Sequence, residues 1–309
     1  MKEISKEIFN NYQIRNTKYQ KEEFRNYIIN KLKDSGYDVN IQSKRNTHNI
    51  IIGDINNAKV IFTAHYDTCS VLPFPNLIVP NNLFGFIFSQ ILVCVMLFLF
   101  VGIISIIPYM LLSMINLEGI AFSLAMLFML LWMFFGKANK HTANDNTSGV
   151  ITIIEILLSL NEELKNGVCF ILFDNEEKGL IGSSIFAEEY KNIIKDKLIV
   201  NFDCVADGDN LFFFPSKSIK GDSEIKNIIN KSYTSSNDKK IFINDGFSFY
   251  PSDNLNFNKS FGVCSLKKKV FYYMDRIHTS KDIIFDENNI ELLSNGSIKF
   301  IKEYINHQH

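Results

Sequence analysis

The chain has 309 residues, of which 47% are hydrophobic, and its 32 Lys and Arg residues balance 33 Asp and Glu residues to a formal net charge of −1. A chain so close to neutral has no basic footprint for a nucleic acid, so we expect no nucleic-acid partner. The five cysteines are odd in number and show no CxxC spacing, which argues against the disulfide framework of an oxidising compartment.

Short apolar runs and amphipathic stretches alternate along most of the chain. The apolar runs predict buried strands, and the amphipathic stretches predict helices on the faces of a sheet. The expected fold class is α/β, with three layers (α/β/α) and a mostly parallel central sheet. The predicted strands are 60–64, 168–173, 198–202 and 261–266, and the predicted helices are 21–34, 149–164, 183–194, 223–232 and 287–305.

An apolar insert interrupts this alternation. Between residues 77 and 135 the only charged side chain is Glu118. The segments 83–107 and 119–135 are each long enough to cross a hydrocarbon core, which needs about 17–25 residues, and 108–118 would contain the connection. We therefore expect a transmembrane helical hairpin at 77–136, inserted into a catalytic domain formed by 1–76 and 137–309. The alternative is one or two buried core helices.

The flanking charges predict the orientation of the hairpin. The chain begins MKEISKEIFN, without the apolar stretch of a cleavable signal peptide. Lys137 and Lys140 lie on the domain side, and the hairpin loop has no Lys or Arg, in agreement with the positive-inside rule. Since a hairpin returns the chain to the side it left, we expect a cytoplasmic catalytic domain. The Asn, Ile, Lys and Phe bias suggests a bacterial genome, so the expected location is the bacterial cytoplasmic membrane.

Five side chains that commonly bind metals each come after an apolar, strand-like run. Alone, each has an ordinary interpretation as a turn residue or a structural histidine. Together they indicate a metal site, because imidazole and carboxylate are ligands of Zn²⁺, and the carboxyl ends of parallel strands converge at one edge of a sheet. The five residues are His65, Asp145, Glu177, Asp203 and His278, in the stretches VIFTAHYDT, HTANDNTSGV, CFILFDNEEKGLIGS, LIVNFDCVAD and MDRIHTSKD.

These motifs resemble those of the co-catalytic zinc aminopeptidases, the family that also contains glutamate carboxypeptidase II and glutaminyl cyclase. The match covers about residues 15–75 and 138–305. The resemblance implies a zinc-exopeptidase fold, a peptide substrate and two Zn²⁺ ions, with Co²⁺ or Mn²⁺ as possible occupants. It makes His65 a ligand of one ion and His278 a ligand of the other, with Asp145 bridging both and Glu177 and Asp203 completing the two sites.

The same resemblance assigns Glu176 as general base and Asp67 as the residue that orients His65. Two zinc ions about 3.5–4 Å apart can share a water, lower its pKa and polarise the carbonyl that it attacks. Neighbouring glutamates in a turn point in different directions, so that Glu177 can bind metal while Glu176 faces the water. Asp67, two residues after His65, can accept the second ring N–H of that histidine.

Two alternatives stay open. Glutaminyl cyclases, single-zinc acyltransferases, carry extra residues in the segment that here reads EEKGLIGS (176–183) and a tryptophan before the last histidine, where this chain has Ile277. A metal-free interaction module, like the protease-like domain of the transferrin receptor, would lack ligands that this chain retains. Ser252 and Asp253 either begin a loop beside the substrate or form a plain turn. No sequence feature specifies an oligomeric state.

Overall fold

A nine-stranded mixed sheet forms the centre of the computed structural model, which describes residues 1–236 and 238–307. The strand order is β1-β2-β4-β3-β5-β8-β6-β7, and β9 pairs with one end of β8. The strands are β1 (Val39–Lys44), β2 (Thr47–Ile52), β3 (Val60–His65), β4 (Val168–Phe173), β5 (Leu198–Phe202), β6 (Asn210–Pro215), β7 (Lys240–Ile243), β8 (Ser260–Lys268) and β9 (Tyr272–Tyr273).

The central strands β4, β3, β5 and β8 run parallel to one another. They are almost entirely buried, as expected for strands of a parallel sheet that is covered on both faces. The four predicted strands are therefore confirmed, and so is the α/β fold class. The outer pairings are antiparallel, except that of β6 with β7, so the parallel part of the sheet is its centre.

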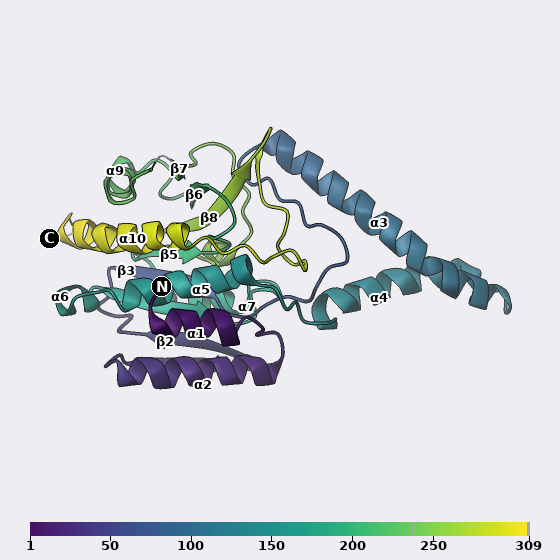
Figure 1. Cartoon of the computed structure of the whole chain (residues 1–309), viewed down its shortest axis with the longest axis horizontal. Coiled ribbons are helices and arrows are strands. Elements are labelled where there is room, and N and C mark those ends of the chain that lie inside the picture. The colour runs from purple at the N-terminus through teal and green to yellow at the C-terminus, as the bar shows by residue number, and fades with distance from the viewer. Residues whose placement is uncertain (237, 308–309) are drawn as a thin grey trace.

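Helices cover both faces of the sheet, which gives the predicted three layers (Figure 1). One face packs against α1, α2, α5, α9 and α10, and the other packs against α7 and α8. Residues of β3 alternate accordingly: Phe62 faces the first group and Ile61 the second. The helices are α1 (Glu3–Asn11), α2 (Lys18–Asp34), α5 (Gly149–Leu157), α6 (Glu162–Lys165), α7 (Ile181–Glu189), α8 (Lys191–Ile194), α9 (Ser223–Ser232) and α10 (Glu287–His307).

Two predicted helices are each divided in the structure. The stretch 149–164 forms α5 and α6, because the Asn161 side chain accepts a hydrogen bond from the Leu164 N–H and starts a new helix. The stretch 183–194 forms α7 and α8, which meet at Tyr190. The other three predicted helices are confirmed, and α1 is a helix that the sequence pattern did not predict.

Helices α3 (Leu83–Ser113) and α4 (Ala121–Phe135), joined through the short helix η1 (Glu118–Ile120), project away from the sheet (Figure 1). Two segments, Leu83–Ser113 and Glu118–Phe135, are long and apolar enough to cross a membrane. Only 6% of the most apolar part of the first segment and 17% of that of the second is buried inside the protein. These helices therefore do not form part of the core of the domain.

The connection between the two long helices lies inside the segment that was expected to contain it. Pro108, expected in the connection, lies inside α3, which continues to Ser113. A proline removes one backbone hydrogen bond and crowds the preceding turn, but membrane-spanning helices tolerate it because local adjustments satisfy the freed backbone groups. The connection before η1 is therefore residues 114–117, which lie within the segment 108–118 that was expected to contain it, and α3 ends six residues later than the predicted 107.

Candidate metal centre

Three of the five predicted ligands lie at or just after the carboxyl ends of central strands. His65 is the last residue of β3, Asp203 follows β5 directly, and Glu177 lies shortly after β4. The expectation that all five follow strands is wrong for Asp145, in the turn η2 (Ala143–Ser148), and for His278, in the loop after β9. These two residues do not follow strands because they lie in connections that cross this edge of the sheet. The structure nevertheless brings all five side chains together.

The Asp145 carboxylate lies between the two histidines. Its Oδ1 is 3.3 Å from His65 Nε2, and its Oδ2 is 3.0 Å from His278 Nε2. Asp203 Oδ1 lies 3.5 Å from His65 Nε2, and Glu177 Oε2 lies 3.2 Å from His278 Nε2. The arrangement is therefore two half-sites, each with one imidazole and one carboxylate of its own, that share Asp145.

This donor set fits zinc. Zinc lies about 2.0–2.2 Å from nitrogen and oxygen ligands, which puts atoms bound to one tetrahedral ion about 3.3–3.6 Å apart. The four separations between nitrogen and oxygen atoms given above, 3.0 to 3.5 Å, are close to that spacing. In addition, Glu177 Oε1 is buried and has no hydrogen-bond partner, so it has a free lone pair for an ion. Each half-site can therefore accept a divalent cation.

The electrostatics of the cluster show an excess of buried negative charge. Burial raises the pKa of Glu177 to about 8, so the protein environment alone disfavours its charged form. Burial also opposes protonation of His278, but Glu177 and Asp145 outweigh this effect and raise its pKa to about 10. A cation between these groups would take the place of the proton, which is the usual relation between metal binding and ligand pKa.

Asp67 contacts the site differently from the prediction. His65 Nδ1 lies 3.1 Å from the backbone carbonyl of Asp67, whereas the nearest carboxylate oxygen is 3.7 Å away. The carboxylate instead accepts hydrogen bonds from the backbone N–H groups of Glu176, at 3.0 Å, and Glu177, at 3.3 Å. Asp67 thus contacts His65 through its backbone carbonyl, with its carboxylate at the longer distance of an ion pair, and holds the turn of the two glutamates through its side chain.

Glu176 lies on the same side of the cavity as His65, with its Oε2 3.9 Å from His65 Nε2. Its pKa is well above the ordinary value of a glutamate because the side chain is buried and because Glu177, Asp253 and Asp203 are close. This carboxylate lines the cavity and lies outside the pairs that link Asp145 to the histidines, although with His65 and Asp203 it also forms a group that could hold an ion.

One supporting residue, Asp282, escaped the sequence analysis, and a second, Ser252, was expected either in a loop beside the substrate or in a plain turn. Asp282 accepts hydrogen bonds from the backbone N–H groups of Asn144, at 2.8 Å, and Asp145, at 3.0 Å, and so fixes the shared ligand. Ser252 Oγ donates to Asp203 Oδ2 at 2.6 Å, which gives this residue a definite contact beyond that of a plain turn. Asp282 lies only four residues after His278, inside the last motif, and that closeness was the available signal.

A cavity of about 220 Å³ adjoins the ligands, and the ends of the hairpin approach it. Asn76 and Ile78, which precede α3, line this cavity. Met133 and Phe134 of α4 line a neighbouring pocket together with Glu177 and His278. The Leu72 N–H also donates to the carbonyl of His278 at 2.7 Å. Both ends of the hairpin therefore lie at the rim of the candidate metal centre.

Comparison with known proteins gives one family and several similar folds. The model of "Peptidase family M28" matches residues 132–300. The LapA aminopeptidase of Legionella pneumophila is 14% identical, with a TM-score of 0.58 over 97% of this chain and 69% of that protein. Porphyromonas gingivalis glutaminyl cyclase has the same fold at 15% identity, with a TM-score of 0.59 over 97% of this chain and 95% of that protein. A Zn-dependent exopeptidase from Parabacteroides distasonis also has it at 15% identity, with a TM-score of 0.58 over 96% of this chain and 94% of that protein. No curated protein matches the chain.

Proposed function

Since the chain belongs to peptidase family M28 and is a zinc metallopeptidase, we propose that it is a membrane-anchored aminopeptidase with two metal ions and Glu176 as general base. The observation that carries this proposal is the position of Asp145. Its two carboxylate oxygens lie against two different histidines, 3.3 and 3.0 Å away. A single-zinc site has no need of a shared carboxylate between two half-sites.

In the proposed reaction, His65, Asp145 and Asp203 would hold one ion, and His278, Asp145 and Glu177 would hold the other. When bound, the ions would supply Lewis-acid polarisation of the peptide carbonyl and would lower the pKa of the attacking water. Glu176 takes a proton from that water and passes it to the leaving amine, so that the C–N bond breaks as the new C–O bond completes the carboxylate. Asp67 and Asp282 keep the base and the shared ligand in position through their backbone contacts.

The test of this activity is a substrate screen with the detergent-purified full chain. We expect release of free amino acids from aminoacyl and dipeptide substrates, loss of activity with a chelator and recovery with Zn²⁺, Co²⁺ or Mn²⁺. A peptide with amino-terminal glutamine belongs in the same screen. Formation of pyroglutamyl peptide without hydrolysis of any substrate would favour the glutaminyl-cyclase alternative.

The anchoring proposal concerns residues 77–136, with 1–76 and 137–309 as the catalytic domain. The two apolar helices support it by their length and exposure. The flanking Lys137 and Lys140 favour a cytoplasmic domain, and the Asn, Ile, Lys and Phe bias favours a bacterial membrane. Because the hairpin occupies the connection between β3 and α5, at the carboxyl edge of the sheet, this topology places the active site close to the bilayer.

We predict that this closeness selects for apolar peptides. The variant replaces residues 84–128 by a short Gly/Ser loop, which keeps Ile78 and Trp132, and kcat/KM is compared with that of the intact enzyme in liposomes. We expect a selective loss on apolar peptides and little change on hydrophilic ones. An equal change in kcat/KM for apolar and hydrophilic peptides would mean that the hairpin only anchors the enzyme. Release of the intact chain from membranes by alkaline carbonate would exclude the anchoring role as well.

A further inference from the structure

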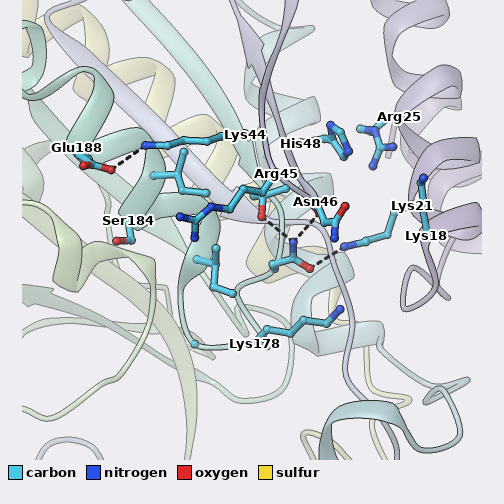
Figure 2. Close-up of a pocket in the computed structure, with 15 residues that line it drawn as sticks. Lys18, Lys21, Arg25, Lys44, Arg45, Asn46, His48, Lys178, Ser184 and Glu188 are labelled. Atoms are coloured by element: carbon cyan, nitrogen blue, oxygen red, sulfur yellow. Dashed lines mark hydrogen bonds and ion pairs between the residues drawn. The ribbon is translucent and has the colours of Figure 1, made fainter.

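A basic pocket of about 750 Å³, drawn in Figure 2, includes Lys178 and Gly179 of the turn that follows Glu177 and lies outside the catalytic cavity. Three parts of the chain supply its cations: α2, the end of β1 with the turn that follows it, and the turn after Glu177. The six lysine and arginine side chains that line it are Lys18, Lys21, Arg25, Lys44, Arg45 and Lys178. We call it the basic pocket.

Most of this positive charge is not balanced by the protein. Asp174 pairs with Lys21 at 2.5 Å, and Glu188 pairs with Lys44 at 2.9 Å. Within residues 1–236 and 238–307, the other four cations form no ion pair. The basic pocket therefore has a net positive charge, which favours an anionic ligand.

Arg25 is the clearest sign that an anion belongs there. Only 8% of this residue is exposed, and no carboxylate pairs with it among the residues that the structure describes. Its Nη1 donates to the hydroxyl of Tyr66 at 2.9 Å, and that hydroxyl in turn donates to the carbonyl of His48. A buried guanidinium without a counter-ion is unfavourable, and its remaining N–H groups match the oxygens of a phosphate.

The basic pocket lies next to the carboxyl end of α4. Lys178 lines both the basic pocket and the smaller pocket that Asn16 shares with Met133 and Phe134 of α4. In the proposed membrane topology, the carboxyl end of α4 marks the level at which the chain leaves the hydrocarbon core. Lipid headgroups lie at that level, and anionic headgroups attract clusters of lysine and arginine.

We propose that the basic pocket binds the phosphate headgroup of an anionic phospholipid. The proposal rests on the membrane anchoring stated above. A lipid fits better than an acidic peptide substrate, because the lining of the basic pocket shares no residue with that of the catalytic cavity. Ile181 and Ile185, which also line the basic pocket, offer apolar contact to the glycerol and upper acyl region.

The test uses the full chain in a neutral detergent and native mass spectrometry. The probes are dioctanoyl phosphatidylglycerol, dioctanoyl phosphatidylcholine, inorganic phosphate and a hexaglutamate peptide. The variant is Lys18→Gln with Arg45→Gln, since both side chains are exposed and neither forms an ion pair within the described residues. The matched control, Lys195→Gln with Lys299→Gln, removes the same charge from exposed positions outside the basic pocket.

We expect the wild type to bind phosphatidylglycerol but not phosphatidylcholine, with affinity reduced about tenfold or more in the pocket variant and unchanged in the control. Equal affinity of both variants, or equally tight binding of inorganic phosphate, would overturn the assignment to a lipid. If the wild type binds hexaglutamate more tightly than phosphatidylglycerol and the pocket variant loses this binding, the basic pocket would be assigned to a peptide. A carbonate wash of membranes separates the lipid-binding proposal from the anchoring proposal. If only the lipid-binding proposal is wrong, the chain stays in the membrane pellet.

Discussion

Replacing Glu176 by Gln is expected to lower kcat by about 10²- to 10⁴-fold, the usual effect of losing a general base. Gln is nearly isosteric with Glu, and the backbone N–H of residue 176 can still donate to Asp67, so the turn keeps its shape. The metal content should therefore stay that of the wild type. Steady-state kinetics and elemental analysis on the same preparation measure both quantities.

Glu177→Gln is the matched control, because it alters the neighbouring carboxylate in the same way. We expect it to weaken metal binding first, since Glu177 Oε2 lies 3.2 Å from His278 Nε2 in one half-site. Normal turnover of the Glu176 variant at full metal occupancy would refute the assignment of the base. A loss of metal from the Glu176 variant equal to that from the Glu177 variant would make both residues ligands.

Replacing Asp145 by Ala is expected to empty both half-sites together and to abolish hydrolysis. The two carboxylate oxygens each face a different histidine, so one substitution removes a ligand from both ions. His278→Ala should mainly empty the half-site that contains Glu177. The ratio of metal to protein measures both effects. An Asp145 variant that keeps one ion at wild-type affinity would show that this carboxylate serves a single site.

The central strands and the five clustered candidate ligands could be predicted from local sequence. Buried parallel strands are continuous apolar runs, and β3, β4, β5 and β8 have that pattern. The strand β6 reads NLFFFP and was not predicted, although its apolar run is about as long as that of β5. The division of 149–164 at Asn161 depends on one side-chain cap, which periodicity does not detect.

The details of the candidate site depend on contacts between distant parts of the chain. Asp67 was expected to orient His65 through its carboxylate, but that carboxylate bonds to backbone groups more than 100 residues away, at Glu176 and Glu177. The basic pocket likewise joins α2, the turn between β1 and β2 and the turn at Lys178. Such groupings follow from sheet order, which the sequence pattern did not specify.

The ratio of metal to protein in the active wild-type enzyme tests the shared-carboxylate site most directly. The full chain is purified in detergent, dialysed against buffer with trace Zn²⁺ and analysed for bound metal at the preparation's maximal turnover. Two divalent ions per chain are expected, because Asp145 joins two half-sites that each have an imidazole and a carboxylate of their own. One ion per chain at full activity would contradict the dinuclear site and favour the single-zinc alternative.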